Sequence, residues 1–114
     1  MKFLASVYEP MYEYNSKKYI RIRIPPALVT RVNDTQMKMN HLLTNSNIDN
    51  PLEGSILKVK IPFRYRRVMC EVKGKPLQSC VRGDEIKVEI DFKGYWNVGD
   101  YSGFSWVLKS SEYS

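Results

Sequence analysis

Strict alternation of apolar and polar residues in two segments is the feature that most constrains this chain. Residues 18–24 place an isoleucine at every second position, with tyrosine and arginine between them. Residues 85–92 repeat the pattern with Ile, Val, Ile and Phe. A period of two with β-branched residues puts one set of side chains on each face of a strand. We therefore expect half-buried strands, the first ending at Pro25 because proline cannot donate to a strand ladder.

Weaker alternation predicts strands elsewhere in the chain, over residues 3–8, 55–63, 64–72 and 104–108, with a short return strand at 77–81. Residues 93–103 are expected to connect the last two strands. Trp106 alternates with Phe104 and Leu108, which predicts that it lies in the core. At least five strands of this spacing favour a small barrel or sandwich, and the length favours one domain spanning residues 1–114.

The segment from Pro25 to Gly54 has no clear period. Asp34 could cap a short helix over residues 35–43, whereas residues 29–32 could equally form a strand. Residues 44–54 are rich in asparagine and are expected to form a loop. A segment this long between two strands should hold structure or carry function.

The residues that usually carry catalysis or bind metals are sparse. The chain has one histidine, His41, and two cysteines, Cys70 and Cys80, whose spacing fits no zinc site. We expect reduced thiols, no enzyme activity, no metal and no cofactor. Carboxylates for a metal-dependent nuclease are present but fit a turn and a solvated strand face better; they are Asp84, Glu85, Glu89, Asp91 and Asp100.

Positive charge is concentrated in two stretches. The chain has 18 Lys and Arg against 12 Asp and Glu, a formal net charge of +6. Residues 58–82 hold eight basic residues and one acid, and residues 17–38 hold six basic residues and one acid. No apolar run approaches the roughly 20 residues of a membrane helix, and residues 1–7 are too short for a secretory signal. We expect no membrane association and a cytoplasmic protein, or one in the host cytoplasm or nucleus if it is viral.

Aromatic residues are interleaved with these basic residues. Lys and Arg neutralise phosphates, aromatic rings stack on unpaired bases, and arginine can do both. The residues expected to bind nucleic acid are Tyr19, Arg21, Arg23, Lys58, Lys60, Tyr65, Arg67, Tyr95 and Trp96. The alternative is a solvated polar face with tyrosines packed on lysine stems. Tyr8, Tyr12 and Tyr14 could serve a core edge, an oligomer contact or stacking.

The C-terminal third resembles a known family. Residues 81–90 (VRGDEIKVEI), 94–96 (GYW) and 101–109 (YSGFSWVLK) resemble the last two strands of OB-fold proteins, especially small single-stranded-DNA-binding proteins of phages and DNA viruses. The resemblance implies DNA contact by the sheet face and by the loops joining the first and last strand pairs. Two features depart from the family: residues 109–114 carry only one acid where many such proteins have an acidic tail, and Pro25–Gly54 has no obvious counterpart.

The sequence thus predicts a mainly β protein, a small five-stranded OB-like barrel with one short helix. Its expected function is sequence-tolerant binding of single-stranded DNA in replication, recombination or repair, with the choice of DNA over RNA resting on the resemblance. A homo-oligomer is expected because small barrels expose strand edges that pair readily. The alternative is a viral β-barrel or sandwich whose basic faces bind an acidic protein partner.

Overall fold

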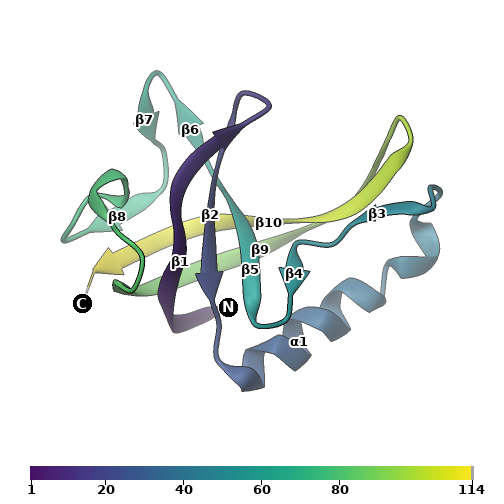
Figure 1. The fold of residues 1–114 in the computed structure, drawn as a ribbon, viewed down its shortest axis with the longest axis horizontal. Helices are drawn as coiled ribbons and strands as arrows, with labels where there is room; N and C mark the ends of the chain where they lie inside the picture. Colours follow the sequence, from purple (N-terminus) through teal and green to yellow (C-terminus); the bar gives the residue numbers. More distant parts are fainter. Residues whose placement is uncertain (114) are drawn as a thin grey trace.

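The computed structural model describes residues 1–113 of this protein (Figure 1). Its strands are β1 Lys2–Tyr14, β2 Lys17–Arg23, β3 Asn47–Asp49, β4 Leu52–Glu53, β5 Ile56–Ile61, β6 Phe63–Arg64, β7 Arg67–Val68, β8 Glu71–Lys73, β9 Glu85–Val98 and β10 Tyr101–Tyr113. The helix α1 spans Pro26–Met37, and two short 3₁₀ helices, η1 and η2, span Asn40–Leu42 and Leu77–Ser79. None of these helices is long and apolar enough to cross a membrane.

Long strands close into a barrel in the order β1-β2-β5-β10-β9. The pairs β1–β2, β2–β5, β9–β10 and β1–β9 are antiparallel. A parallel bridge between Val107 and Lys60 joins β10 to β5 and completes the ring. This is the partly open five-stranded arrangement of an OB-like barrel. The predicted fold class is confirmed.

The barrel core consists of the apolar residues at alternate strand positions. All three isoleucines of residues 18–24 are buried, as are Ile86, Val88 and Ile90 on β9. The other strands contribute in the same way, with Phe3, Ala5, Val7, Leu57, Val59, Ile61, Trp106 and Leu108. The alternation therefore determines which side chains remain outside, and on β2 these are Tyr19, Arg21 and Arg23.

The helix α1 begins where β2 ends, and this corrects two predictions for the segment. Pro25 is extended at the N-cap and Pro26 takes the first helical turn, where a missing N–H costs nothing. Asp34 therefore lies inside the helix instead of capping one at residues 35–43, and residues 29–32 are helical instead of forming a strand. Pro25-Pro26 therefore marks the start of α1 as well as the end of β2, whereas the prediction took account only of the end of the strand.

One end of the barrel is covered by α1, which buries Val32 and Gln36. The Trp106 indole Nε1 donates to Gln36 Oε1 at 2.9 Å, and Gln36 Nε2 donates to Asn50 Oδ1 at 3.0 Å. A buried amide needs such partners because water cannot reach it. Trp106 is 2% exposed, which confirms its predicted core position.

Three further sequence predictions are wrong. Residues 64–72 are not one strand: β6 and β7 form a tight hairpin, and β8 follows separately against β10. Residues 77–81 contain η2 instead of a return strand. Residues 93–103 are mostly strand, because β9 and β10 extend to a turn at Gly99–Asp100. An alternation made of Tyr and Arg does not show which face of a strand is buried. Such a pattern therefore does not show where the strand ends.

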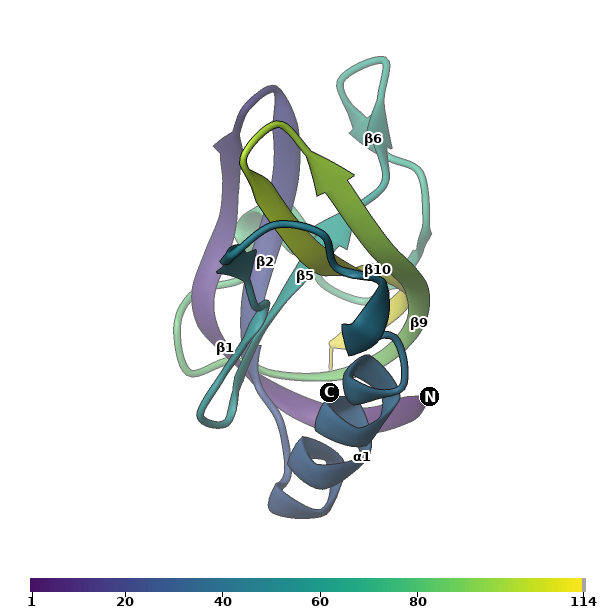
Figure 2. The same cartoon turned by 90° about the vertical axis from the view of Figure 1, so that its right-hand side faces the viewer.

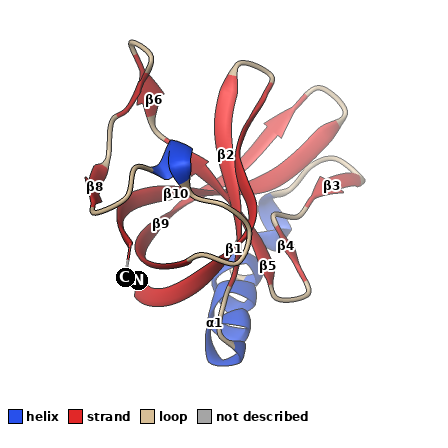
Figure 3. Ribbon diagram, turned by 60° about the vertical axis from the view of Figure 1, so that its left-hand side comes forward, coloured by secondary structure: helices blue, strands red, loops and turns tan. Residues whose placement is uncertain are grey.

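The hairpins β1–β2, β6–β7 and β9–β10 project from the same end of the molecule, and α1 lies at the other end (Figures 1 and 2). Figure 3 shows the same separation from a third direction, with β6 standing apart from the barrel. The strand β3 pairs in parallel with β10, beside the β9–β10 hairpin. These hairpins carry many of the residues predicted to bind nucleic acid.

Candidate nucleic-acid interface

The structure gathers five of the predicted binding residues on the outside of β2 and β5. In the antiparallel register Tyr19 is opposite Lys60 and Arg21 is opposite Lys58, with Arg23 farther along β2. The adjacent strand β1 adds side chains that the prediction did not include. We call this surface the barrel face; it consists of Tyr8, Glu9, Tyr12, Tyr19, Arg21, Arg23, Lys58 and Lys60.

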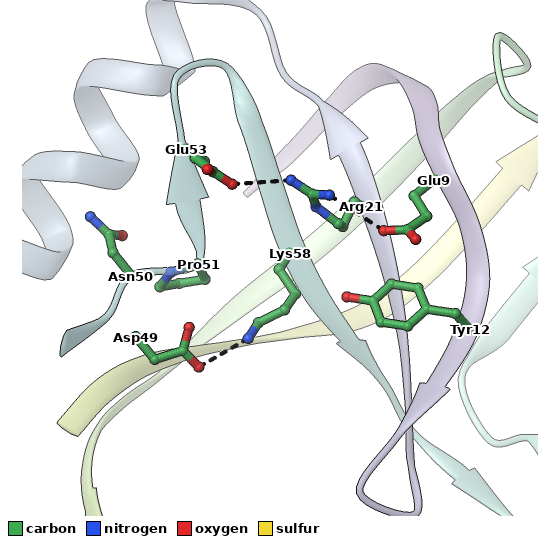
Figure 4. Close-up of a pocket in the computed structure, with 8 residues that line it drawn as sticks. All are labelled: Glu9, Tyr12, Arg21, Asp49, Asn50, Pro51, Glu53 and Lys58. Carbon is green, nitrogen blue, oxygen red and sulfur yellow. Dashed lines mark hydrogen bonds and ion pairs between the residues drawn. The ribbon is translucent and has the colours of Figure 1, made fainter. Parts of the chain in front are cut away.

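Two cations of the barrel face already have carboxylate partners (Figure 4). Arg21 Nη1 lies 3.4 Å from Glu9 Oε1 and its Nη2 lies 3.2 Å from Glu53 Oε2. Lys58 Nζ lies 3.0 Å from Asp49 Oδ2. Partly exposed ion pairs of this kind contribute about 0–1 kcal/mol. A phosphate can therefore replace these carboxylates at small cost.

A shallow hollow of about 280 Å³ lies between these ion pairs. It is lined by Glu9, Tyr12, Arg21, Asp49, Asn50, Pro51, Glu53 and Lys58. Its lining carries a net charge of −1, since three carboxylates face two cations. These carboxylates were not predicted to belong to the site, because they come from β1, β3 and β4, outside the two basic stretches.

The tyrosine rings of the barrel face are largely covered. The rings of Tyr12 and Tyr19 stack on each other, with centroids 5.8 Å apart and planes 29° apart. Lys58 Nζ lies 5.3 Å from the Tyr19 ring centroid. Burial raises the pKa of both hydroxyls, with Glu9 adding to the rise for Tyr12 and Asp49 adding to it for Tyr19.

Tyr8 is the centre of a cation cluster that the prediction also missed. Its ring centroid lies 4.4 Å from the Arg82 guanidinium carbon, 5.2 Å from that of Arg21 and 5.7 Å from that of Arg23. Arg82 reaches Tyr8 because the turn that leads into β9 is hydrogen-bonded to β1. In this turn, Gly83 N–H donates to the Val7 carbonyl oxygen at 2.8 Å. This contact spans most of the chain, and no local pattern could reveal it.

Other cations of the barrel face are not neutralised. Arg23 Nη1 donates to Ser55 Oγ at 3.0 Å, and within residues 1–113 it has no carboxylate partner. Lys60 also forms no ion pair with the described residues. Arg23 and Lys60 thus leave the barrel face with a positive surplus.

Tyr65 and Arg67 would share one face if residues 64–72 formed the single strand that was predicted. They lie instead on the β6–β7 hairpin. The hairpin, residues 63–68, is here called the arginine hairpin because Arg64, Arg66 and Arg67 flank Tyr65 in the sequence. All three guanidinium groups are exposed and form no ion pair within the described chain. The hairpin base adjoins the start of β2, where Lys18 Nζ lies 5.1 Å from the Phe63 ring centroid.

Tyr95 and Trp96 belong to the β9–β10 hairpin, apart from the barrel face. Trp96 is opposite Gly103, and a methyl group at Gly103 would lie 2.6 Å from the Trp96 ring. The indole therefore lies against the backbone and is partly buried. Asn97 fixes this hairpin by accepting from Thr44 N–H at 3.0 Å and donating to the Leu42 carbonyl at 3.1 Å.

Among the side chains considered for catalysis, Asp84 forms structural hydrogen bonds and the two cysteines are free thiols. Asp84 accepts hydrogen bonds from Lys75 Nζ and from Val81 N–H, both at 2.9 Å, and these bonds hold the pKa of its carboxyl below the usual value. Cys70 and Cys80 are free thiols, and burial raises the pKa of each. No three His, Cys, Asp or Glu side chains of residues 1–113 are grouped to hold a metal ion.

Comparison of the chain with protein-family models, with curated proteins and with solved structures found no significant match in any of the three. The features that bear on function are therefore the barrel, its exposed cations and its aromatic rings.

Proposed function

We propose that this protein binds single-stranded DNA with little sequence preference and acts where single strands arise in replication, recombination or repair. The observation that carries the proposal is a set of cations without carboxylate partners within residues 1–113, which are Arg23 and Lys60 on the barrel face and the three arginines of the arginine hairpin, with tyrosines near them. Cations of this kind neutralise phosphates, and neutralisation releases the counterions that drive binding.

The barrel face is suited to the DNA backbone. Arg23 and Lys60 meet phosphates directly, whereas Arg21 and Lys58 exchange the carboxylates of Glu9, Glu53 and Asp49 for phosphate. Rings that stack on bases contribute about 1–3 kcal/mol each and accept every base. Lysines and arginines on the barrel face, together with the exposed ring of Tyr65 on the arginine hairpin, therefore favour binding that tolerates any sequence.

Self-association fits the same proposal. The short strands β3 and β8 each pair only with β10 among the described residues, and β4 pairs only with β5. An unpaired strand edge can add a strand from a second copy. A homo-oligomer assembled in this way would line up several barrel faces along one nucleic-acid strand.

A second candidate function is recognition of an acidic protein partner. It is favoured by the ion pairs of the barrel face, in which Arg21 and Lys58 already bind the carboxylates of Glu9, Glu53 and Asp49. An acidic peptide could take the place of these carboxylates through the same electrostatic complementarity.

The test is a titration of fluorescein-labelled oligo(dT) of about 20 nucleotides, followed by anisotropy at about 50 and 200 mM salt. We expect saturable binding that weakens with salt, with a slope of about 0.7 per phosphate contact. Oligo(U) of equal length measures the preference for DNA, and light scattering measures the oligomeric state. Absence of binding at the lower salt would contradict the proposal and direct the search to acidic proteins.

Tryptophan fluorescence adds a second reading to this titration. Trp106 is buried beneath α1, so a change on binding reports Trp96 in the β9–β10 hairpin. Quenching would place the bound oligonucleotide against the β9–β10 hairpin, as the family resemblance implies. Binding without quenching would restrict the contact to the barrel face and the arginine hairpin.

A further inference from the structure

Two hairpin turns of this protein have the same backbone but very different residues. In the β1–β2 turn, Asn15 and Ser16 have φ of 52° and 64°. In the β6–β7 turn, Tyr65 and Arg66 have φ of 53° and 63°. Two consecutive left-handed residues match the twist of flanking strands, and Asn or Gly is preferred there. Tyrosine and arginine at these positions cost conformational free energy.

The side chains of the β6–β7 turn do not offset that cost with contacts. Tyr65 is 81% exposed, more than any other large hydrophobic side chain described. No ring contact or hydrogen bond involving the Tyr65 side chain exists within residues 1–113, nor an ion pair of Arg66. Strain held at a site with no internal compensation is the kind found at functional positions. These residue types are thus explained by a contact outside the chain.

Tyr65 differs from the tyrosines of the barrel face in its availability. Tyr12 and Tyr19 stack on each other, and Tyr8 is covered by three guanidinium groups. Tyr65 presents an uncovered ring on a short turn. The hairpin also projects from the barrel, as Figures 1 and 3 show, so both sides of its tip can be approached.

On the basis of the proposed function, we propose that the arginine hairpin is the element that selects unpaired nucleotides. Tyr65 stacks on a base that has left the duplex stack, while Arg64, Arg66 and Arg67 hold the adjacent phosphates. A paired base is covered by its neighbours, so a ring can stack on it only after the base is extruded, which costs free energy. The arginines bind phosphates of either form. Preference for single strands therefore depends on Tyr65, and the barrel face provides affinity without this discrimination.

The decisive variant is Tyr65→Asn, because asparagine suits the left-handed turn and keeps all three arginines. Anisotropy titrations use labelled oligo(dT) of about 20 nucleotides and a blunt duplex of equal length. We expect the affinity for oligo(dT) to fall roughly 5- to 150-fold, the affinity for the duplex to change less than about twofold, and the melting temperature not to fall. Tyr14→Ala is the matched control, since it removes another exposed tyrosine, on the neighbouring β1–β2 hairpin, and should leave both affinities unchanged.

The outcomes separate this inference from the function on which it rests. If wild type binds oligo(dT) and Tyr65→Asn binds it equally well, the hairpin is not the selector, although the proposed function stands. An equal loss for oligo(dT) and duplex makes Tyr65 a general contact and also overturns the inference. If wild type binds neither probe, both the inference and the proposed function fail.

Discussion

The barrel face and the arginine hairpin contain the same kinds of residue, yet their surroundings differ. On the barrel face, Arg21 lies between Glu9 and Glu53, and Lys58 contacts Asp49. On the hairpin, Arg64, Arg66 and Arg67 have no carboxylate partner within residues 1–113. A basic residue that is already paired must release its partner before it binds a phosphate. An unpaired one only sheds water and counterions, so the hairpin is expected to provide more binding free energy per residue.

The largest effect is expected from removing the charges of the hairpin. Arg64→Ala, Arg66→Ala and Arg67→Ala together should weaken oligo(dT) binding on the order of 100-fold at low salt and reduce the salt slope by about 2. The matched control removes three exposed cations elsewhere, at Arg31, Lys38 and Lys93. Equal losses in the two triple variants, measured by anisotropy, would mean that only net charge matters and would remove the distinction between the regions.

A smaller effect of opposite sign is expected from the carboxylates. Glu9→Gln with Glu53→Gln frees Arg21 and removes two negative charges from the barrel face. Binding of oligo(dT) should become about 3- to 10-fold tighter at low salt because the cation no longer exchanges one anion for another. Glu112→Gln with Glu71→Gln, near the C-terminus of β10, is the control with the same change in net charge. Tightening limited to the control pair would contradict the assigned role of Glu9 and Glu53.

The barrel face also contains its own comparison. Arg21 and Arg23 lie on the same strand face two residues apart, but of the two only Arg21 has carboxylate partners within residues 1–113. Both substitutions to alanine should weaken binding across all sequences, and Arg23→Ala should reduce the salt slope by about 0.7. Arg21→Ala should reduce the slope less, because its guanidinium releases fewer counterions on binding. A salt titration of the two variants at equal temperature measures the difference.

No effect on binding is expected at Asp84, whose role is in the turn before β9. Hydrogen bonds from Lys75 and Val81 hold the pKa of the Asp84 carboxyl below its usual value, and the same bond to Asp84 raises the pKa of Lys75. A lowered carboxyl pKa in the folded state stabilises the fold above the unfolded pKa of about 3.9. This stabilisation is lost as the pH falls through the lowered value.

Asp84→Asn should therefore melt below wild type at pH 7, and the difference should disappear as the pH falls below about 4. Thermal unfolding followed by circular dichroism at several pH values measures this convergence. The variant should bind oligo(dT) as wild type does. A binding defect with an unchanged melting temperature would place Asp84 in the interface.

The sequence allowed the strands with a buried side to be predicted, because burial imposes alternation. Residues 18–23 and 85–92 fall in β2 and β9 with the expected faces, and Ile24, just beyond β2, is buried as expected. The alternation also placed Tyr19, Arg21 and Arg23 on one face of a strand, as the structure has them. The register that puts Arg21 opposite Lys58 and Tyr19 opposite Lys60 was not predicted, because it depends on how β2 pairs with β5.

The rest of the site depends on information that is not local. Glu53 and Asp49 reach the barrel face from β4 and β3, short strands in a segment without periodicity. Arg82 reaches Tyr8 only because the turn before β9 is bonded to β1. The arginine hairpin was concealed because two exposed residues adopt a conformation that their types disfavour, and propensity rules do not predict such turns.

The last strand holds the barrel together, and this has a consequence for how the protein folds. β10 pairs with β9, β3 and β8 and forms the bridge to β5. During synthesis the ring cannot close until β10 has left the ribosome, and until then β1, β2 and β5 form an open sheet with an exposed apolar side. Such long-range pairing slows folding, to the millisecond-to-second range in small barrels. The nascent chain is thus most vulnerable to aggregation in the interval before β10 emerges.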